Sequence, residues 1–358
     1  MIETLDHFTA DAPGRFDEVI DVRSPAEFAE DHVPGAINLP VLDDAERATV
    51  GTIYVRQSRL EARVVGAALV ARNIARHLEG PLKSRPGSYA PLVYCWRGGQ
   101  RSNAMATVLS QVGWRPSVLG GGYKTYRRWI MSFLYETDGS VPIVLLDGDT
   151  GSAKTDILAR TAALGVQTLD LEALADHRGS LFGALPGRTQ PSQKMFESRL
   201  ASALSCLDTS RPILVEAESS KIGERVIPPV LWRSMRASPV IRLTVPAAAR
   251  ARYLVEAYGD IIADPSAIAS VLAKLPPHLG GANLRLWKDL LAQGSYEALA
   301  EALMKTHYDP AYARARHRFV RPVLDEIELD DLSVVHRARA AERVARQLQA
   351  GEANTGRR

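Results

Sequence analysis

The sequence predicts an α/β protein made of two successive domains, the second of which ends in a helical region. Three observations predict this class. Short apolar runs that suit strands alternate with segments of helical periodicity in both halves of the chain. Two of the strand-to-helix junctions contain a glycine-rich loop, and the pattern becomes purely helical after about Pro265. A length of 358 residues is sufficient for two separate cores.

Composition narrows the class of protein. The chain is 46% hydrophobic and 24% charged, which is typical of a globular protein and not of a disordered or fibrous one. Its net charge of +3 permits a polyanionic partner but does not require one. With only two cysteines, a disulfide framework is not expected, and a reducing compartment fits. No signal peptide is recognisable and the apolar runs are too short to cross a bilayer, so we expect a cytoplasmic protein.

The first domain is predicted from three strands and two helices. The apolar runs predict strands at Glu18–Val22, Ala36–Leu39 and Leu92–Tyr94, and the helical periodicity predicts helices at Leu60–Leu78 and Ser102–Val112. The second helix should end at Gly113, a residue type favoured just past a helix end. A basic, aromatic connector, Tyr123–Tyr135, follows. It suits either contact with RNA or, as we favour, a helix whose aromatic side chains pack inward.

The second domain opens with an uninterrupted apolar run, which suits a strand covered on both faces of a parallel sheet. The expected strands alternate with helical segments and lie at Val141–Leu146, Gln167–Leu169, Pro212–Glu216 and Val240–Val245. Two amphipathic helices are expected near the end, at Leu284–Leu291 and Tyr296–Met304. Cys206 lies among leucines and alanines, so we expect a small core residue there.

The loop after the Leu92–Tyr94 strand is the first candidate active site. Cys95 would lie at the carboxyl end of the strand, where open α/β sheets place their chemistry. The glycines allow backbone N–H groups to turn inward and bind an anion, and the same field should favour the thiolate, helped by two arginines. The predicted anion loop comprises Trp96, Arg97, Gly98, Gly99, Gln100, Arg101 and Ser102. A buried, inert cysteine is the alternative interpretation, which the flanking residues disfavour.

The loop after the Val141–Leu146 strand is the second candidate. It resembles a P-loop, whose backbone N–H groups cradle a diphosphate while Lys154 reaches the phosphate oxygens and the Thr155 hydroxyl holds Mg²⁺. The predicted diphosphate-binding residues are Gly148, Gly151, Ser152, Lys154 and Thr155. Ala153 departs from the pattern, which has glycine before the lysine; alanine is tolerated there if the residue is helical but not if φ is positive. Asp149 adds negative charge, and a simple strand-to-helix turn is the alternative.

Two further carboxylates end an expected strand. Glu216 and Glu218 could order Mg²⁺ or water beside the second loop, or could be ordinary polar residues at a strand end. Both interpretations stay open, and the metal requirement is not determined by the sequence.

Two segments near the N-terminus carry a family resemblance. Asp21–Phe28, reading DVRSPAEF, and His32–Pro40, reading HVPGAINLP, resemble the two N-terminal signatures of rhodanese domains, and Cys95 matches the position of their active cysteine. The loop is one residue longer than usual, as in cysteine-based phosphatases, so a selenophosphate-sized anion is a reasonable ligand. For the acidic and basic residues of the first signature we favour a role in holding the fold.

The cysteine loop in full, CWRGGQRS, resembles that of tRNA 2-selenouridine synthases. Further matching strings are Leu169–Glu172, His177–Gly183, Gln190–Glu197 and Tyr308–Tyr312, so that the resemblance runs from Asp21 to about Arg316. It implies a rhodanese-like domain with connector over residues 1–137. A P-loop NTPase-like parallel-sheet domain with a helical C-terminal region is then expected over residues 138–358.

The resemblance also implies a transferase that acts on tRNA. A prenyl group from geranyl diphosphate would alkylate the sulfur of a wobble-position 2-thiouridine, and selenium from selenophosphate would then displace the geranyl thiol. We expect the diphosphate at the P-loop and selenophosphate at the Cys95 loop, where the thiolate either carries selenium or orients its donor. Mg²⁺ is a possible cofactor. The anticodon loop would be splayed out for recognition, with contacts to substrate or tRNA expected from His177, Arg178, Ser180, Gln193, Glu216 and Glu218.

Three other functions remain open at this point. A cysteine-based phosphatase joined to a P-loop module fits the loop length, but no general acid is recognisable. A rhodanese-type sulfurtransferase that passes a persulfide to a partner fits the first domain. A tRNA-binding module with degenerate sites would explain Ala153, although the intact cysteine loop disfavours it.

Overall fold

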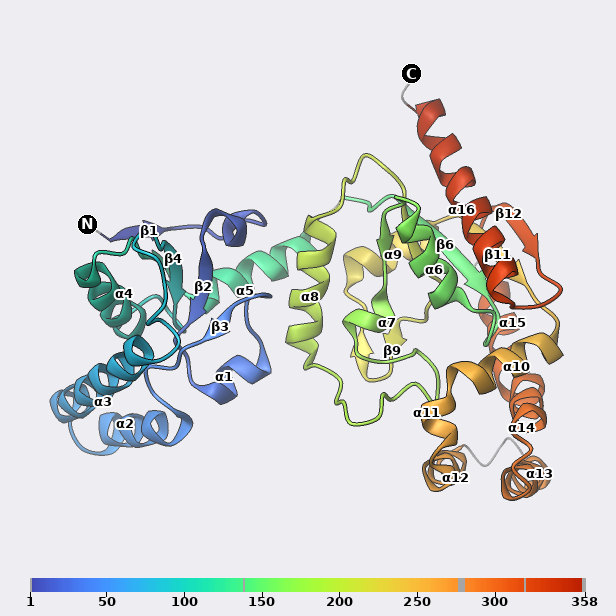
Figure 1. Cartoon of the computed structure of the whole chain (residues 1–358), viewed down its shortest axis with the longest axis horizontal. Helices are drawn as coiled ribbons and strands as arrows, with labels where there is room; N and C mark the ends of the chain where they lie inside the picture. Colours follow the sequence, from blue (N-terminus) through green and yellow to red (C-terminus); the bar gives the residue numbers. More distant parts are fainter. Residues whose placement is uncertain (1, 138, 276–280, 319, 356–358) are drawn as a thin grey trace. The chain divides into compact units, whose positions relative to one another are not determined.

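A computed structural model describes residues 2–137, 139–275, 281–318 and 320–355. The chain forms two compact units (Figure 1). The first contains Met1–Thr137 together with Pro191–Cys206, and the second contains Asp138–Gln190 together with Leu207–Arg358. The segment Pro191–Cys206 thus belongs to the first unit although it follows the phosphate loop in the sequence.

The first unit is built on a parallel five-stranded sheet with the strand order β1-β5-β4-β2-β3. Its strands are β1 (Glu3–Leu5), β2 (Glu18–Asp21), β3 (Ile37–Asn38), β4 (Pro91–Tyr94) and β5 (Ser117–Leu119). The three strands expected from the sequence are present, and β1 and β5 are additional. Strand β4 is the central strand of this order, and all four of its residues are buried. The loop that follows it, with Cys95, therefore lies at the carboxyl end of the central strand.

Six α-helices accompany this sheet among the described residues. They are α1 (Pro25–Glu30), α2 (Asp44–Arg56), α3 (Arg59–Glu79), α4 (Gln100–Val112), α5 (Tyr123–Met131) and α8 (Gln193–Ser205). Helix α4 ends as expected, because Gly113 adopts a left-handed conformation with φ of 101° and donates its N–H to Leu109 and Ser110. One face of α4 packs into a core that includes Met105, Leu109 and Val93.

The second unit also contains a parallel five-stranded sheet, in the order β12-β11-β6-β8-β7. Its strands are β6 (Ile143–Gly148), β7 (Thr168–Leu169), β8 (Ile213–Glu216), β11 (Val240–Thr244) and β12 (Val323–Glu328). The expectation of only helices after Pro265 is therefore wrong at β12. This strand lies at the sheet edge and only Ile327 of it is buried, so its sequence lacks the long apolar run that marks β6.

Helices of the second unit fall into two groups with separate cores. The sheet core contains side chains of α6 (Lys154–Ala163), α10 (Ala247–Ala257) and α16 (Val334–Thr355). A second cluster around Trp287 joins α12 (Pro265–Ala273), α13 (Gly281–Ala292) and α14 (Tyr296–Leu303). The remaining elements are α7 (Leu171–Leu174), a hairpin of β9 (Lys221–Ile222) and β10 (Arg225–Val226), α9 (Pro229–Ala237), α11 (Gly259–Ile262), a π-helical turn (Met304–Tyr308) and α15 (Asp309–Arg318).

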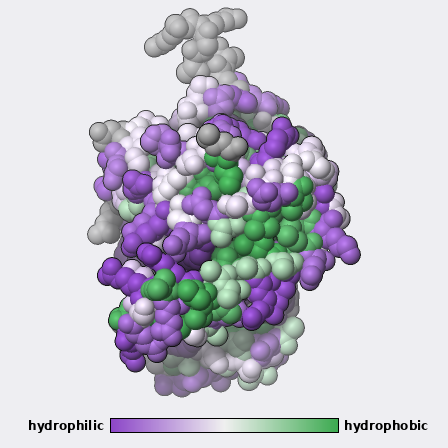
Figure 2. Space-filling model, turned by 90° about the vertical axis from the view of Figure 1, so that its left-hand side faces the viewer, coloured by the Kyte–Doolittle hydropathy of each residue, from purple (hydrophilic) through white to green (hydrophobic). Residues whose placement is uncertain are grey.

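The surface of the first unit mixes charged and apolar side chains. Figure 2 shows apolar patches among hydrophilic residues on the face turned to the viewer. Exposed apolar side chains of α3 and α4 include Leu60, Val64 and Val112. Among the described residues, no helix combines the length and the apolar character needed to span a membrane.

Candidate active sites

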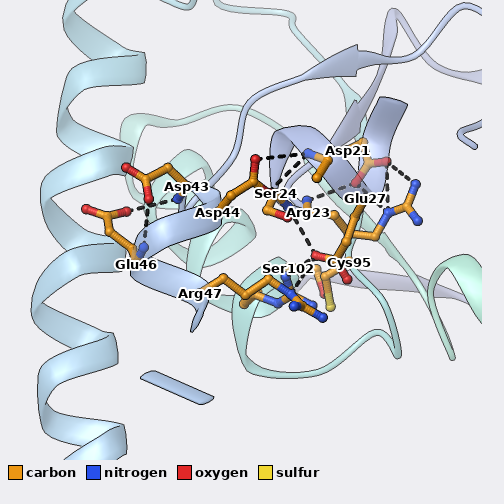
Figure 3. Close-up of polar contacts among 12 residues, drawn as sticks. Asp21, Arg23, Ser24, Glu27, Asp43, Asp44, Glu46, Arg47, Cys95 and Ser102 are labelled. Atoms are coloured by element: carbon orange, nitrogen blue, oxygen red, sulfur yellow. Dashed lines mark hydrogen bonds and ion pairs between the residues drawn. The ribbon is translucent and has the colours of Figure 1, made fainter. Parts of the chain in front are cut away.

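The Cys95 loop joins β4 to α4 and directs polar groups at the thiol (Figure 3). The side-chain oxygen of Ser102 lies 3.2 Å from the Cys95 sulfur. The backbone N–H of Gly99 donates to the same sulfur at 3.3 Å. The residue is only 3% exposed, yet the loop amides point toward the sulfur and not away from it. This arrangement is the inward-facing nest expected of an anion-binding loop.

The pKa of the Cys95 thiol reflects two opposing effects. Burial raises the pKa, because it disfavours the charged form. Hydrogen bonds from the Ser102 hydroxyl and from the amides of Ser102, Arg97 and Gly99 outweigh burial and bring the pKa below its usual value. The loop therefore favours the thiolate, which is the nucleophilic form of cysteine.

Gly98 is required by the path of this loop. Its φ of +63° lies in the left-handed region, and an added Cβ would stand 2.6 Å from both the Leu119 carbonyl and the Gly121 amide. The cysteine loop thus packs backbone against backbone on the segment that follows β5.

The two arginines of the loop do not act as the sequence suggested. We expected charge from Arg97 and Arg101 to favour the thiolate, but the leading contributions are hydrogen bonds. Arg101 instead donates to the Glu27 carboxylate at 3.1 Å. Glu27 also pairs with Arg47, and both residues are labelled in Figure 3. Arg97 is exposed. Gln100, also exposed, is the first residue of α4.

The first rhodanese-type signature holds the fold, as expected. Arg23 is 1% exposed and pairs with Asp21 at 2.6 Å, while a second hydrogen bond runs to the carbonyl of Asp31. The Arg23 guanidinium also lies 4.1 Å from the ring centre of Tyr123. These buried contacts connect β2 to α5. The side chains of Asp21 and Arg23 are both buried, so their charged groups serve the fold.

A basic cavity of about 720 Å³ adjoins the cysteine loop within the first unit. Its walls combine aromatic and cationic side chains from the loop, α5 and α8, with Trp96 stacked on Tyr123 at 5.1 Å between ring centres. The cations are Arg97, Lys124, Arg127, Arg128 and Lys194. Such a surface suits an anionic ligand.

The connector forms helix α5, and its tyrosines pack inward, as we favoured. Tyr123 is 4% exposed and Tyr126 is 1% exposed, whereas Lys124 and Arg128 are exposed. Helix α5 thus buries Tyr123 and Tyr126, and Tyr123 also reaches the wall of the basic cavity beside the exposed Lys124 and Arg128.

The second loop follows β6 and leads into α6, which is the expected context of a phosphate loop. It contains Gly148, Gly151 and Ser152, whose buried hydroxyl has no hydrogen-bond partner among the described residues. Ala153 adopts φ of 59° and ψ of 29°, the left-handed conformation that favours glycine. The loop thus keeps the backbone path of the glycine-containing pattern and places a buried methyl group on it.

Lys154 and Asp149, the two charged residues of this loop, both have polar partners. Lys154 donates from Nζ to the Gly148 carbonyl at 2.8 Å and lies over the Tyr312 ring. Burial lowers the pKa of Lys154, but Tyr312 and nearby glutamates outweigh that effect, so it is raised. Asp149 pairs with Arg316 at 2.7 Å, which offsets the negative charge noted in the sequence.

Three glutamates meet beside the phosphate loop. Glu172, Glu216 and Glu218 each place a carboxylate oxygen within 4.8 Å of the others. The Thr155 hydroxyl donates to Glu172 at 3.2 Å. Burial, followed by repulsion within the cluster, raises the pKa of all three carboxyl groups. Glu172 was part of a matching string but was not singled out as a site residue by sequence reasoning.

The other predicted contact residues fall into two places. His177 accepts from the Gly179 N–H at Nδ1, and burial lowers its pKa. Arg178 pairs with Asp260 at 2.8 Å and lies over the Tyr258 ring. Ser180 lies 3.3 Å from the Tyr258 hydroxyl, all within the second unit. Gln193, in contrast, lies on α8 of the first unit and donates to Glu197.

An apolar cavity opens next to the phosphate loop, and no sequence motif predicted it. Thr150 of the loop, Ser180 and three tyrosines, Tyr258, Tyr296 and Tyr308, contribute polar groups to its wall. The remaining walls come from α10, α11, α12, α14 and the segments beside them, with lining residues that include Phe182, Leu254, Ile261, Ile268, Leu299, Leu303 and Met304. The site therefore combines an anion-binding loop with an apolar chamber that shares Thr150.

Sequence reasoning also missed the residues that brace the phosphate loop. Arg250 donates to the Thr150 carbonyl at 3.0 Å and forms a bidentate pair with Asp309 at 2.9 Å. Asp309 and Tyr312 belong to the matching string Tyr308–Tyr312, which was the available signal. Cys206, expected in the core, is exposed, because it caps the end of α8 and does not lie on its apolar face.

Comparisons with known proteins match both units. Residues 6–128 match the family model described as a rhodanese-like domain, and residues 141–341 match the model described as the tRNA 2-selenouridine synthase AAA domain. A tRNA 2-selenouridine synthase from Cupriavidus necator is 34% identical over 84% of this chain and 88% of that protein. One from Shewanella oneidensis is 29% identical over 88% and 93%.

A third relative of the same name, from Nitrosomonas europaea, is 36% identical over 70% of this chain, which spans 64% of that protein's length. The matched AAA domain alone, residues 141–341, makes up more than half of the 358 residues. On these matches, the chain belongs to the tRNA 2-selenouridine synthase family.

Proposed function

We propose that this protein replaces the sulfur of a wobble-position 2-thiouridine in tRNA with selenium, in two transfers. In the first, the thiouridine sulfur attacks C1 of geranyl diphosphate; a carbon–sulfur bond forms, the carbon–oxygen bond breaks, and diphosphate leaves. In the second, the selenium of selenophosphate forms a bond to C2 of the base and the geranyl thiol leaves; water then cleaves the selenium–phosphorus bond, which releases phosphate and leaves selenium on the base. Alkylation matters because sulfur in a thiocarbonyl is a poor leaving group.

The observation that carries this proposal is the position of Thr150. This residue belongs to the phosphate loop and also lines the apolar cavity. A ligand with an anionic head and an apolar tail, as in geranyl diphosphate, suits that combination. The loop would bind the diphosphate through its amides and Lys154, while the cavity would remove the hydrocarbon chain from water at about 0.8 kcal/mol for each buried methylene group.

The Cys95 loop is the proposed site of the selenium donor. Its amides and Ser102 stabilise a negatively charged sulfur, and the same donors can bind the oxygens of a tetrahedral anion. The adjoining basic cavity carries five cations, of which Arg127 and Lys194 also pair with Glu197 and Glu30. The exposed Arg97, Lys124 and Arg128 are the ones best suited to the phosphates of the donor and of an anticodon loop. Names of relatives in the same family support tRNA as the substrate.

Mass analysis of tRNA nucleosides tests the proposal. After incubation with geranyl diphosphate and selenophosphate, we expect a geranylated thiouridine intermediate and then selenouridine. Cys95→Ala should stop the reaction after geranylation, whereas Lys154→Ala should chiefly impair geranylation. Matched controls are the exposed Cys206→Ser and the exposed Lys288→Ala, which should behave like the unmodified protein. Normal selenouridine formation by both site variants would contradict the assignment.

A further inference from the structure

The strands of the second unit bring three glutamates from separate segments to one point. Glu216 is the last residue of β8, and Glu218 follows two residues later. Glu172 lies in α7, directly after β7, which is the sheet neighbour of β8. Because parallel strands end at the same edge of a sheet, the three carboxyl groups meet there, with one oxygen of each within 4.8 Å of the others.

Glu216 is the unusual member of this cluster. Its side chain is 0% exposed, and neither carboxylate oxygen has a hydrogen-bond partner among the described residues. A buried carboxylate without partners is costly, and proteins normally pair such a group or use it to bind a metal ion. The carboxylate faces the other two glutamates, so its neighbours add like charge instead of relieving it.

The nearest cation does not balance this charge. All three glutamates attract the Lys154 ammonium group and raise its pKa. The hydrogen bonds of that ammonium group, however, run to the Gly148 and Asp149 carbonyls. One ammonium group against three carboxyl groups leaves an excess of negative charge when they ionise. Carboxylate oxygens gathered in this way are the ligands of hard divalent cations.

We propose that Glu172, Glu216 and Glu218 form a binding site for a hard divalent cation such as Mg²⁺ or Mn²⁺, and that the site binds the cation without any diphosphate. In an octahedral Mg²⁺ site with metal–oxygen bonds of about 2.1 Å, adjacent ligand oxygens lie about 3.0 Å apart and opposite ones about 4.2 Å apart. The three glutamate oxygens, all within 4.8 Å of one another, are gathered closely enough to converge on one ion, and they draw closer together when it binds.

Gly179 supports the same site from the other side. Its φ is +66°, and an added Cβ would stand 2.5 Å from a Glu172 oxygen and 3.0 Å from both Glu218 oxygens. The backbone at Gly179 therefore lies directly against the Glu172 and Glu218 carboxylates. A side chain at this position would take up space that the carboxylate oxygens need to close around an ion.

This site differs from the way magnesium is usually held beside a phosphate loop. There the ion keeps several waters and relies on one or two protein ligands together with the substrate phosphates. Three carboxylates and the nearby Thr155 hydroxyl make a site that the protein can fill by itself. The inference therefore does not depend on which diphosphate, if any, the loop binds.

Titration of the full-length protein with Mn²⁺ in phosphate-free buffer tests the proposal, with free Mn²⁺ measured by electron paramagnetic resonance. We expect one tight Mn²⁺ per chain. Glu216→Gln keeps the shape but removes the charge, and should weaken binding at least tenfold. The exposed Glu342→Gln, also in the second unit, is the matched control and should bind like the unmodified protein.

Two additional variants protect the test against misfolding. Glu172→Gln and Gly179→Ala alter the site from other segments, and each should also weaken Mn²⁺ binding while circular dichroism confirms a folded chain. Absence of bound Mn²⁺ at millimolar concentration would overturn the proposal. Binding that appears only after inorganic diphosphate is added would overturn it too, because the ion would then be held by the phosphates. Neither result would bear on the proposed transfers to tRNA.

Discussion

The hydroxyl oxygen of Ser102 lies 3.2 Å from the sulfur of Cys95, across the first turn of α4. The same hydroxyl lies 3.2 Å from the Gly99 carbonyl, so Ser102 is held in place beside the sulfur. Ser102 is completely buried, and its hydroxyl and amide are the leading groups that lower the Cys95 pKa against the effect of burial. The reactivity of the cysteine should therefore depend on a residue that is not itself a nucleophile here.

Replacement of Ser102 by alanine should raise the Cys95 pKa. A hydrogen bond to a charged group contributes about 1.5 to 3 kcal/mol, so the pKa of the Cys95 thiol should rise by about one pH unit or more. Since the thiolate forms above the pKa, the pH profile of selenium transfer should move to higher pH. Alkylation of Cys95 by iodoacetamide, followed as a function of pH, measures the same shift directly.

This measurement needs a defined background, because Cys206 is exposed and would also be alkylated. All variants should therefore carry Cys206→Ser. Gln111→Ala, an exposed change near the far end of α4, is the matched control and should leave the alkylation profile in place. An unchanged profile in Ser102→Ala would show that the backbone amides alone set the pKa.

Ala153→Gly should change stability little, in spite of the left-handed backbone at this position. Relief of that conformation gains about 1 to 2 kcal/mol. Loss of a buried methyl group costs about 0.8 kcal/mol, and the added freedom of glycine in the unfolded chain costs about 0.5 to 1 kcal/mol. These contributions nearly cancel, so we expect urea unfolding within about 1 kcal/mol of the unmodified protein.

Ala153→Val is the informative contrast, because a β-branched residue is poorly tolerated at positive φ. It should destabilise the protein clearly more than the glycine variant does. Equal unfolding midpoints for the two variants would mean that the loop conformation is not maintained in solution.

Local patterns predicted those parts of the fold where pattern and packing agree. The helical periodicity of Ser102–Val112 and its Gly113 cap were sufficient for α4. The apolar run that forms β6 was sufficient for a central strand. The edge strand β12 was not predicted, because an edge strand with one buried side chain has no continuous apolar run. The packing of α8 in the first unit depends on tertiary contacts such as Ser198 to Asp31, which no local pattern contains.

Among the candidate sites, those continuous in sequence were predicted, and those brought together only by the fold were not. Both anion loops are continuous in sequence, so their glycines and their cysteine or lysine were recognisable. The apolar cavity is assembled from the consecutive helices α10, α11 and α12 together with α14 and residues as distant as Thr150 and Ser180, and its apolar residues resemble ordinary core. Glu172 could not be joined to Glu216 before the order of β7 and β8 in the sheet was known.

Ala300→Phe should selectively impair geranylation. Ala300 lines the apolar cavity, and a phenyl ring there would occupy space needed by the hydrocarbon tail. The Michaelis constant for geranyl diphosphate should rise at least tenfold, while binding of inorganic diphosphate stays unchanged. Ala298→Phe places the same ring on an exposed position of α14 and serves as the control. Equal effects on both diphosphates would show that the cavity does not hold the tail.

Asp309→Asn should loosen the phosphate loop. Arg250 is 5% exposed and depends on Asp309 for charge balance, while it also holds the Thr150 carbonyl. Loss of one partner from a fully buried ion pair costs about 3 to 5 kcal/mol. Asp309 is partly exposed, so we expect about 2 kcal/mol in urea unfolding, together with weaker diphosphate binding. Asp325→Asn, which breaks an exposed pair with Arg343, should cost much less.

Lys124→Ala should weaken tRNA binding through charge alone. Lys124 is exposed on α5 and lines the basic cavity beside the cysteine loop. Removal of one phosphate contact reduces the slope of log affinity against log salt concentration by about 0.7 to 0.9. The loss should therefore be largest at low salt and should be the same for tRNAs with different wobble bases, because a phosphate contact carries no sequence information.

The exposed Lys83→Ala, on the same unit but outside the cavity, should leave both affinity and slope unchanged. Filter binding over a series of salt concentrations measures both quantities. An unchanged slope in Lys124→Ala would place the tRNA phosphates elsewhere.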